Sequence, residues 1–142
     1  MASESRATTV WEGDLPSGRG TMSAASGVLP DVEVTWTGRT ERTPGTTSPE
    51  ELLAGAHASC YCMGLSAELG KSDTPPERLE ASCTVTFVAG EGVKSSHIVV
   101  KGRVPGIDQA AFDEAAQAAG EGCPISGALK GNVEITVEAT LE

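Results

Sequence analysis

The most constraining feature of this sequence is a helix start followed by a long run of small and apolar residues. Ser48, Pro49 and Glu51 match the N-cap, N1 and N3 positions of a helix, where the serine and glutamate side chains form a capping box. The pattern continues to about Leu69, and Gly70 ends it. Because the body, LLAGAHASCYCMGLSAEL, is apolar or small nearly all the way round, we predict a central helix buried on most sides.

The segments on either side of this helix predict an α+β fold, with strands first, helices in the middle and a strand last. Turn residues before the helix separate three short strands and a polar loop, at Thr9–Glu12, Gly18–Ser23, Val32–Thr37 and residues 40–48. After the helix we expect two strands, two helices and a final strand, at Glu80–Val88, His97–Val104, Asp108 to Ala119, Pro124 onward and Val133–Leu141. No repeat or linker divides the chain, so we expect one domain over residues 1–142, with residues 1–8 flexible.

The acidic composition excludes several classes of partner. The formal net charge is −10, and aromatic residues make up only 4% of the chain. Nucleic acid and anionic membranes both require a basic face, and single-stranded bases require aromatic stacking platforms. The apolar runs are far shorter than the roughly 20 residues of a spanning helix, and the N-terminal residues lack the apolar core of a signal peptide. We therefore expect a cytoplasmic location, where thiols are kept reduced.

Four cysteines are the candidate reactive residues. Cys60 and Cys62 lie two positions apart on the predicted central helix, so their side chains diverge and cannot form a disulfide while the helix is intact. Cys83 falls on the apolar face of a predicted strand, as expected of a small buried residue. The spacing matches no zinc motif, and only His57 and His97 could add imidazole ligands, so we expect no metal site.

The remaining cysteine, Cys123, immediately precedes Pro124 and so occupies the predicted N-cap of a short helix. Backbone N–H groups and the helix dipole at such a position lower the pKa of a thiol. From the residues alone, Cys123 is therefore the better candidate for a thiolate, because Cys60 in mid-helix needs a cation from elsewhere. A packing role for all four thiols remains open at this point.

Four segments resemble one known family when they are taken together and in this order. They are WEGD, SPEELLAGAHASCYCMGL, VPGID and GCPIS, which begin at Trp11, Ser48, Val104 and Gly122. The chain is similar, from about Trp11 to its end, to the osmotically inducible protein C (OsmC) family, which belongs with the organic hydroperoxide resistance (Ohr) proteins. The resemblance implies an OsmC/Ohr-like fold, an intertwined homodimer with sites at the subunit interface, and a thiol peroxidase that reduces organic hydroperoxides and, less well, hydrogen peroxide.

The same resemblance implies roles for four residues. By the match of HASC, Cys60 corresponds to the peroxidatic cysteine, and by the match of GCPIS, Cys123 corresponds to the resolving cysteine. Glu50 matches the glutamate of the site. The arginine that stabilises the thiolate is best matched by Arg39, with Arg42 as its competitor. Cys62 has no counterpart in the pattern and is assigned no catalytic role.

These roles agree with the chemistry of the side chains. A guanidinium stays charged and pairs with anions, so it can offset the burial of a thiolate, and we expect Glu50 to hold Arg39 by a bidentate pair. On one straight helix, residues 50 and 60 lie roughly 15 Å apart along the axis. Either the helix breaks between them, or the Glu50 that serves a given Cys60 comes from the partner subunit. His57, one turn before Cys60, either tunes the site or is a packed residue.

The implied cycle needs no bound cofactor, and the sequence contains no nucleotide-binding motif. An external dithiol regenerates the thiols, and in the superfamily this reductant is typically a lipoylated protein. Two other functions remain open. One is a non-enzymatic, stress-related dimer that binds a ligand between its subunits, and the other is a general disulfide oxidoreductase, which the absence of a CxxC motif disfavours.

Overall fold

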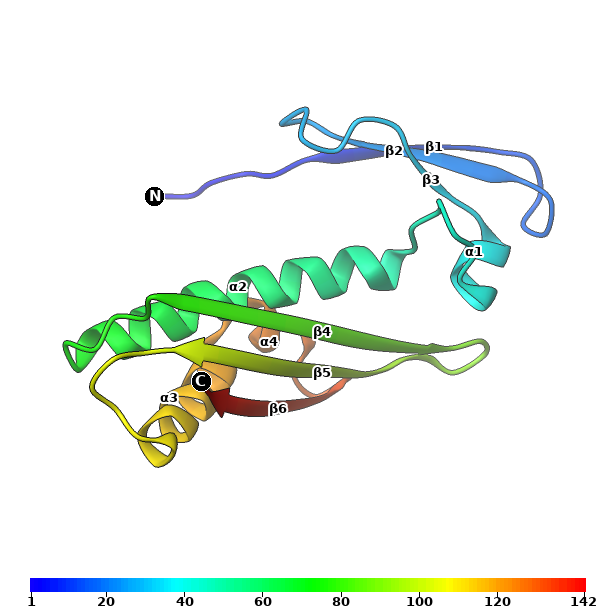
Figure 1. The fold of residues 1–142 in the computed structure, drawn as a ribbon. Coiled ribbons are helices and arrows are strands. Elements are labelled where there is room, and N and C mark those ends of the chain that lie inside the picture. The colour runs from blue at the N-terminus through cyan, green and yellow to red at the C-terminus, as the bar shows by residue number, and fades with distance from the viewer. The chain divides into compact units, whose positions relative to one another are not determined.

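The computed structural model describes residues 1–142, which form two compact units, Met1–Leu52 and Leu53–Glu142 (Figure 1). The helix α2 (Pro49–Lys71) begins in the first unit and continues without interruption into the second. The expectation of a single domain stays a prediction.

The first unit consists of a three-stranded antiparallel sheet and a short helix. The strands pair in the order β1-β2-β3, with bounds Ala7–Glu12, Arg19–Ala24 and Val32–Val34. The helix α1 (Trp36–Glu41) occupies residues that the sequence assigned to the end of a strand and the start of a loop, so that part of the prediction is wrong. The physical reason is a cap: the Thr35 hydroxyl accepts a hydrogen bond from the Gly38 N–H at 2.9 Å and starts a helix.

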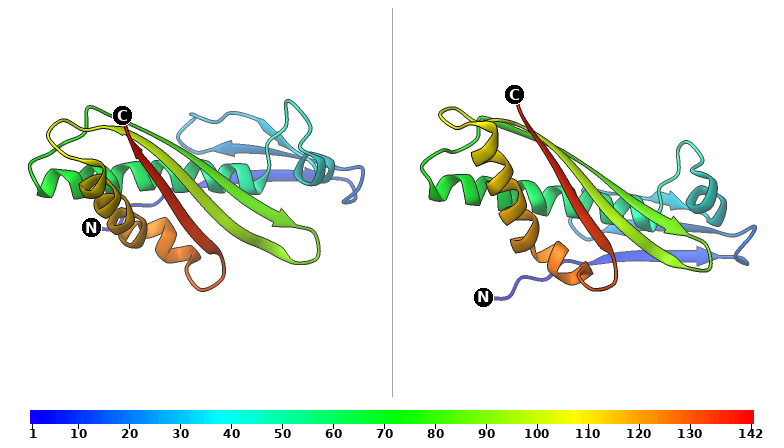
Figure 2. Two further views of the ribbon diagram at one scale, coloured as in Figure 1. Left: turned by 60° about the horizontal axis from the view of Figure 1, so that its bottom comes forward. Right: turned by 90° about the horizontal axis from the view of Figure 1, so that it is seen from below.

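The second unit packs helices against a mixed three-stranded sheet. Its further elements are β4 (Arg78–Val88), β5 (Gly92–Arg103), α3 (Gln109–Gly122), α4 (Pro124–Leu129) and β6 (Glu134–Leu141). The sheet order is β4-β5-β6, in which β4 and β5 form an antiparallel hairpin and β6 lies parallel to β5. Figure 2 shows α3 and α4 carrying the chain back along the sheet between β5 and β6, as a parallel pair requires.

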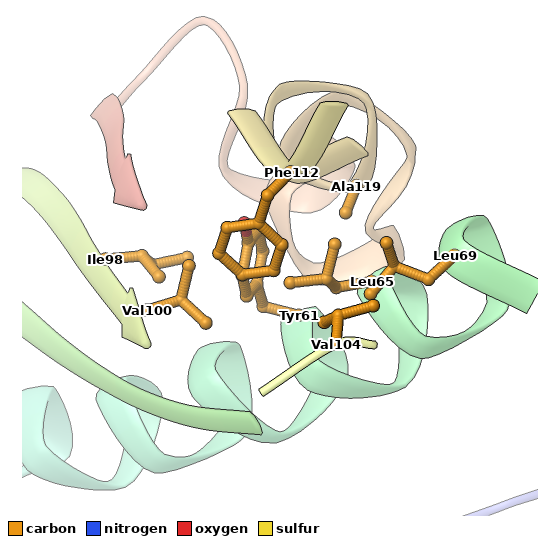
Figure 3. Packing of buried hydrophobic residues seen from close by; sticks show 8 residues of the cluster. All are labelled: Tyr61, Leu65, Leu69, Ile98, Val100, Val104, Phe112 and Ala119. Atoms are coloured by element: carbon orange, nitrogen blue, oxygen red, sulfur yellow. The ribbon is translucent and has the colours of Figure 1, made fainter. Parts of the chain in front are cut away.

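The core of the second unit lies between α2, α3 and the sheet. Tyr61, Leu65 and Leu69 recur every four residues along one side of α2 and meet β5 and α3 side chains, among them Ile98 and Phe112 (Figure 3). The Tyr61 hydroxyl donates a hydrogen bond to the Ala116 carbonyl of α3 at 2.9 Å. These contacts fix the rotation of α2 about its axis, and with it the direction of its cysteines.

The opposite side of α2 is more exposed than its composition predicts. Gly55, Ala56, Ser59 and Ala67 are exposed, and Met63 is 73% exposed. The prediction of a helix buried on most sides is therefore wrong for the single chain, because no element of the second unit covers this side. No helix of the chain is both long enough and apolar enough to cross a membrane.

Candidate thiol site

Two elements of the second unit bring Cys60 and Cys123 together. Cys60 lies in the middle of α2 and is partly exposed, whereas Cys123 is only 1% exposed. Their thiols are free and hydrogen-bonded to each other. The structure thus juxtaposes two thiols that are remote in sequence, and both are free to react.

Cys123 stands at the junction of two helices. Its backbone N–H donates to the Ala119 carbonyl at 3.0 Å and closes α3, and its own carbonyl accepts from the Gly127 N–H at 2.9 Å within α4. Pro124 takes the first position of α4, where a missing N–H costs nothing. The predicted position of Cys123 at the N-cap of a short helix is confirmed.

The environments of the two sulfurs move their pKa values in opposite directions. Burial raises the pKa of Cys60, and its hydrogen bond to Cys123 raises it further. Burial alone would also raise the pKa of Cys123. The Ser126 and Ile125 N–H groups, the Cys60 thiol and the Ser126 hydroxyl, all close to the sulfur, outweigh burial, so this pKa is lowered. Within the second unit, Cys123 is therefore the thiol that ionises more readily, as its helix position predicts.

A buried histidine that the sequence left between two interpretations adjoins this pair. His57 has no exposed surface, and its ring bridges two buried serines. Nδ1 lies 2.6 Å from Ser96 Oγ on β5, and Nε2 lies 2.7 Å from Ser126 Oγ on α4. Cys83 of β4 lies beside the same cluster, with its sulfur 3.1 Å from Ser96 Oγ. Cys83 therefore packs as a small, partly buried residue that also contacts polar neighbours.

Cys62 points away from the thiol pair, as the helical spacing predicts. Its sulfur receives a hydrogen bond from the Ala81 N–H of β4, and burial raises its pKa.

No three His, Cys, Asp or Glu side chains gather closely enough to hold a metal ion. A cavity of about 440 Å³ opens beside Ser126 and is lined by residues of α3, α4 and β6, including Gln117 and Thr136, and by Lys130 just after α4.

The first unit contains the expected arginine–glutamate pair. Arg39 of α1 contacts Glu50 at the start of α2 through Nε, 3.1 Å from both carboxylate oxygens, and through Nη2, 2.6 Å from Oε1. Glu50 is 6% exposed. The competitor Arg42 pairs instead with Glu51, at 3.1 Å and in solvent. The geometry therefore distinguishes the two arginines, because only Arg39 is held by a buried carboxylate.

The helix start beside this pair agrees with half of the predicted capping box. The Ser48 hydroxyl accepts a hydrogen bond from the Glu51 N–H at 3.0 Å, which confirms Ser48 as the N-cap. The Glu51 carboxylate accepts from the Thr47 hydroxyl at 2.7 Å and from Arg42. These partners take the carboxylate away from the role that a capping box gives it, so that half of the prediction is wrong.

Comparison with known proteins shows which family the chain belongs to. Residues 38–138 match the model of the OsmC-like protein family. The chain belongs to the OsmC-like family. It is 39% identical, over 93% of its length and 92% of the relative, to the peroxiredoxin OsmC of Escherichia coli strain K12. It is 31% identical, over 64% of its length and 65% of the relative, to an organic hydroperoxide resistance protein of Xanthomonas axonopodis pv. citri.

Solved structures of the OsmC and Ohr proteins share the fold. The organic hydroperoxide resistance protein OhrB of Bacillus subtilis superposes with a TM-score of 0.70 at 24% identity, covering 95% of this chain and 98% of that one. An OsmC-like protein from Mycoplasma pneumoniae gives a TM-score of 0.73 at 16% identity, with 99% of each chain covered. The expected OsmC/Ohr-like α+β fold is confirmed.

Proposed function

We propose that this protein is a cysteine-based peroxidase that reduces organic hydroperoxides, and hydrogen peroxide less well. The observation that carries the proposal is the hydrogen-bonded pair of free thiols, Cys60 and Cys123, in a chain 39% identical to a peroxiredoxin. Thiols that already touch can close a disulfide without a large movement of the chain. The names of the relatives support the class of substrate.

The proposed cycle uses one thiol to attack and the other to resolve. The Cys60 thiolate attacks the outer peroxide oxygen, the O–O bond breaks, and the alkoxide takes up a proton and leaves as the alcohol. Cys60 is then a sulfenic acid. Cys123 displaces its hydroxyl group to form the Cys60–Cys123 disulfide and water. A dithiol, which we propose is carried by a lipoylated protein, restores both thiols by exchange.

In this proposal, Arg39 is the cation that favours the Cys60 thiolate, and Glu50 orients it. The raised pKa of Cys60 supports the need for a cation, since burial disfavours its charged form. Because α2 is continuous from Pro49 to Lys71, no break shortens the roughly 15 Å between the positions of Glu50 and Cys60 along its axis. We therefore propose a homodimer in which the partner subunit supplies the Arg39–Glu50 pair.

The test is dithiol-dependent turnover of tert-butyl hydroperoxide and of hydrogen peroxide. We expect the wild type to prefer the organic substrate, Cys60→Ser to consume neither, and Cys123→Ser to react once and then stall or over-oxidise. Cys62→Ser is the matched control and should turn over normally, because its sulfur points toward β4. Unchanged turnover in Cys60→Ser would refute the proposal and favour a non-enzymatic, ligand-binding dimer.

A further inference from the structure

A chain of hydrogen bonds leads from the thiol pair into the protein, and the proposed cycle does not use it. The Ser126 hydroxyl contacts the Cys123 sulfur, and Ser126 Oγ lies 2.7 Å from Nε2 of His57. The far side of the ring continues to Ser96 Oγ, 2.6 Å from Nδ1. Three elements, α2, α4 and β5, thus contribute to one buried line of polar groups that ends on a reacting sulfur.

The groups around the His57 imidazole determine its protonation state and its hydrogen bonds. The groups that face it are Ser126 from α4, Ser96 from β5 and the Cys83 thiol from β4, whose sulfur is 3.9 Å from Nδ1. No carboxylate or cation bonds to it, and burial lowers the pKa of His57, so the imidazole is neutral near pH 7. A neutral ring donates at one nitrogen and accepts at the other.

The two orientations of this chain differ in what reaches Cys123. If Ser96 donates to Nδ1, then Nε2–H donates to Ser126 Oγ, and the Ser126 proton is left to point at the Cys123 sulfur. In the opposite orientation, the Ser126 hydroxyl donates to Nε2 and offers the sulfur only a lone pair. The first orientation stabilises a Cys123 thiolate, in the direction that the backbone N–H groups of Ser126 and Ile125 already favour.

We propose that His57, acting through the Ser126 hydroxyl, is a positioning residue that keeps the Cys123 sulfur ionised for the resolving step. This inference rests on the proposed function. In that step the Cys123 thiolate attacks the sulfur of the Cys60 sulfenic acid, the S–O bond breaks as the S–S bond forms, and the departing hydroxide becomes water with a proton from solvent. Cys123 is oxidised, and the sulfenic sulfur of Cys60 is reduced. His57 and Ser126 hold the nucleophile's charge and take no part in the electron count.

The test compares His57→Leu, Ser126→Ala and the double variant with the wild type. Reduced protein is mixed with one equivalent of cumene hydroperoxide, and disulfide formation is followed by quenching and mass spectrometry across about pH 6 to pH 9. We expect both single variants to move the midpoint of this pH profile up by about one unit, so that closure near pH 7 slows about tenfold and converges with the wild type at high pH. The double variant should show no further shift, because both substitutions remove the same interaction.

A second readout does not depend on peroxide. In the Cys60→Ser background, the ultraviolet absorbance of the Cys123 thiolate is titrated with and without Ser126→Ala, and the midpoint should again rise. His97→Leu is the matched control and should leave both readouts unchanged, since His97 lies on β5 beside Thr136. Ser126→Ala removes a single oxygen, so the test stands even if His57→Leu fails to fold.

Two results would overturn the inference. One is an unchanged midpoint in Ser126→Ala, and the other is a rate lowered equally at every pH, which a purely structural role would produce. A wild type that forms no sulfenic acid would refute the proposed peroxidase instead, and the absorbance titration would still decide whether Ser126 and His57 act on Cys123.

Discussion

At the scale of single residues, the two sulfurs of the pair pose different electrostatic problems. Cys123 has its donors close by, in the first turn of α4 and in Ser126. Cys60 has a raised pKa, because burial and then the neighbouring Cys123 thiol disfavour its charged form, so the second unit favours its thiolate less. In the proposed mechanism, the charge that stabilises this thiolate is the guanidinium of Arg39, which a buried carboxylate holds within the first unit.

This dependence predicts that Arg39→Lys and Glu50→Gln slow the reaction with peroxide. An ammonium cannot reproduce the forked contacts to Glu50, and a neutral amide cannot anchor the guanidinium. We expect each variant to lower the second-order rate constant for tert-butyl hydroperoxide by roughly 100-fold, as measured by stopped-flow consumption under dithiol excess. Arg42→Lys is the matched control, because its pair with Glu51 is exposed and such pairs contribute little, and it should change the rate less than about twofold. Equal rates in all three variants would remove Arg39 from the site.

The sequence predicted some of these residues and missed the connections between others. The lowered pKa of Cys123 follows from local chemistry, since Pro124 marks a helix start. The role of Cys60 came only from a family resemblance, because its partner arrives through the fold. Local sequence does not predict the hydrogen bonds of His57, because Ser96 and Ser126 lie 39 and 69 positions after it in the chain. A buried histidine on an apolar helix face was the only hint.

At the scale of the elements, α3 can approach the sheet because β5 carries a glycine at the contact. A Cβ on Gly102 would lie 2.4 Å from Cζ and 2.6 Å from Cε1 of Phe112, whose ring is fully buried. The ring is part of the core that orients α2, so it cannot move without disturbing its neighbours (Figure 3). Gly102 thus fixes the separation of α3 from the sheet.

This contact predicts that Gly102→Ala destabilises the protein by about 1–3 kcal/mol, the usual effect of overpacking a core. Gly55→Ala, at an exposed position of α2 where a Cβ meets nothing within 4 Å, should instead stabilise it by about 0.5–1 kcal/mol. Urea unfolding of both variants, reduced, measures the two effects. An unaltered unfolding midpoint in Gly102→Ala would mean that Phe112 has room that the structure does not show.

Element prediction succeeded where the signal was local. The cap at Ser48 and the glycine at position 70 defined α2 to within two residues of its observed end at Lys71. Two features could not be read in this way. A cap by Thr35 turned Trp36 and the following residues into α1 instead of strand, and the parallel pairing of β6 with β5 depends on a register set by distant residues.

At the scale of the whole molecule, the outward side of α2 is the feature that a single chain leaves unexplained. Its residues are small or apolar, and Met63 at their centre is 73% exposed. Such a surface favours close packing of another protein surface. It agrees with the proposed homodimer, in which each Cys60 would meet the Arg39–Glu50 pair of the partner subunit.

A homodimer predicts twice the chain mass of 14.5 kDa in sedimentation at micromolar concentration. Met63→Glu should weaken the association by about tenfold or more, because it places a charge in an apolar contact. It should also lower peroxide turnover in parallel with dissociation. Lys71→Glu, on an exposed side chain at the end of the same helix, is the control for the added charge. A wild type that sediments as a monomer would rule out a site shared between subunits.

Oxidation of the two thiols to a disulfide should raise the free energy of unfolding. A disulfide between α2 and the start of α4 would enclose β4, β5 and α3 in one covalent loop. By the chain-entropy model, a loop of this length raises the free energy of unfolding by about 4 kcal/mol. Denaturant unfolding of the peroxide-treated protein against the dithiol-treated protein measures this difference, and Cys123→Ser should abolish it.

The junction of α3 and α4 at Cys123 then has a consequence for the lifetime of the protein in a stressed cell. A molecule that has just met an oxidant would be cross-linked across most of its larger unit, and its denatured ensemble would be correspondingly restricted. Proteases cleave transiently unfolded chains, and the oxidised form would contain fewer of these than the reduced form. In the proposed cycle, the disulfide form would therefore be degraded more slowly than the dithiol form, so that it would persist until a reductant restores its thiols.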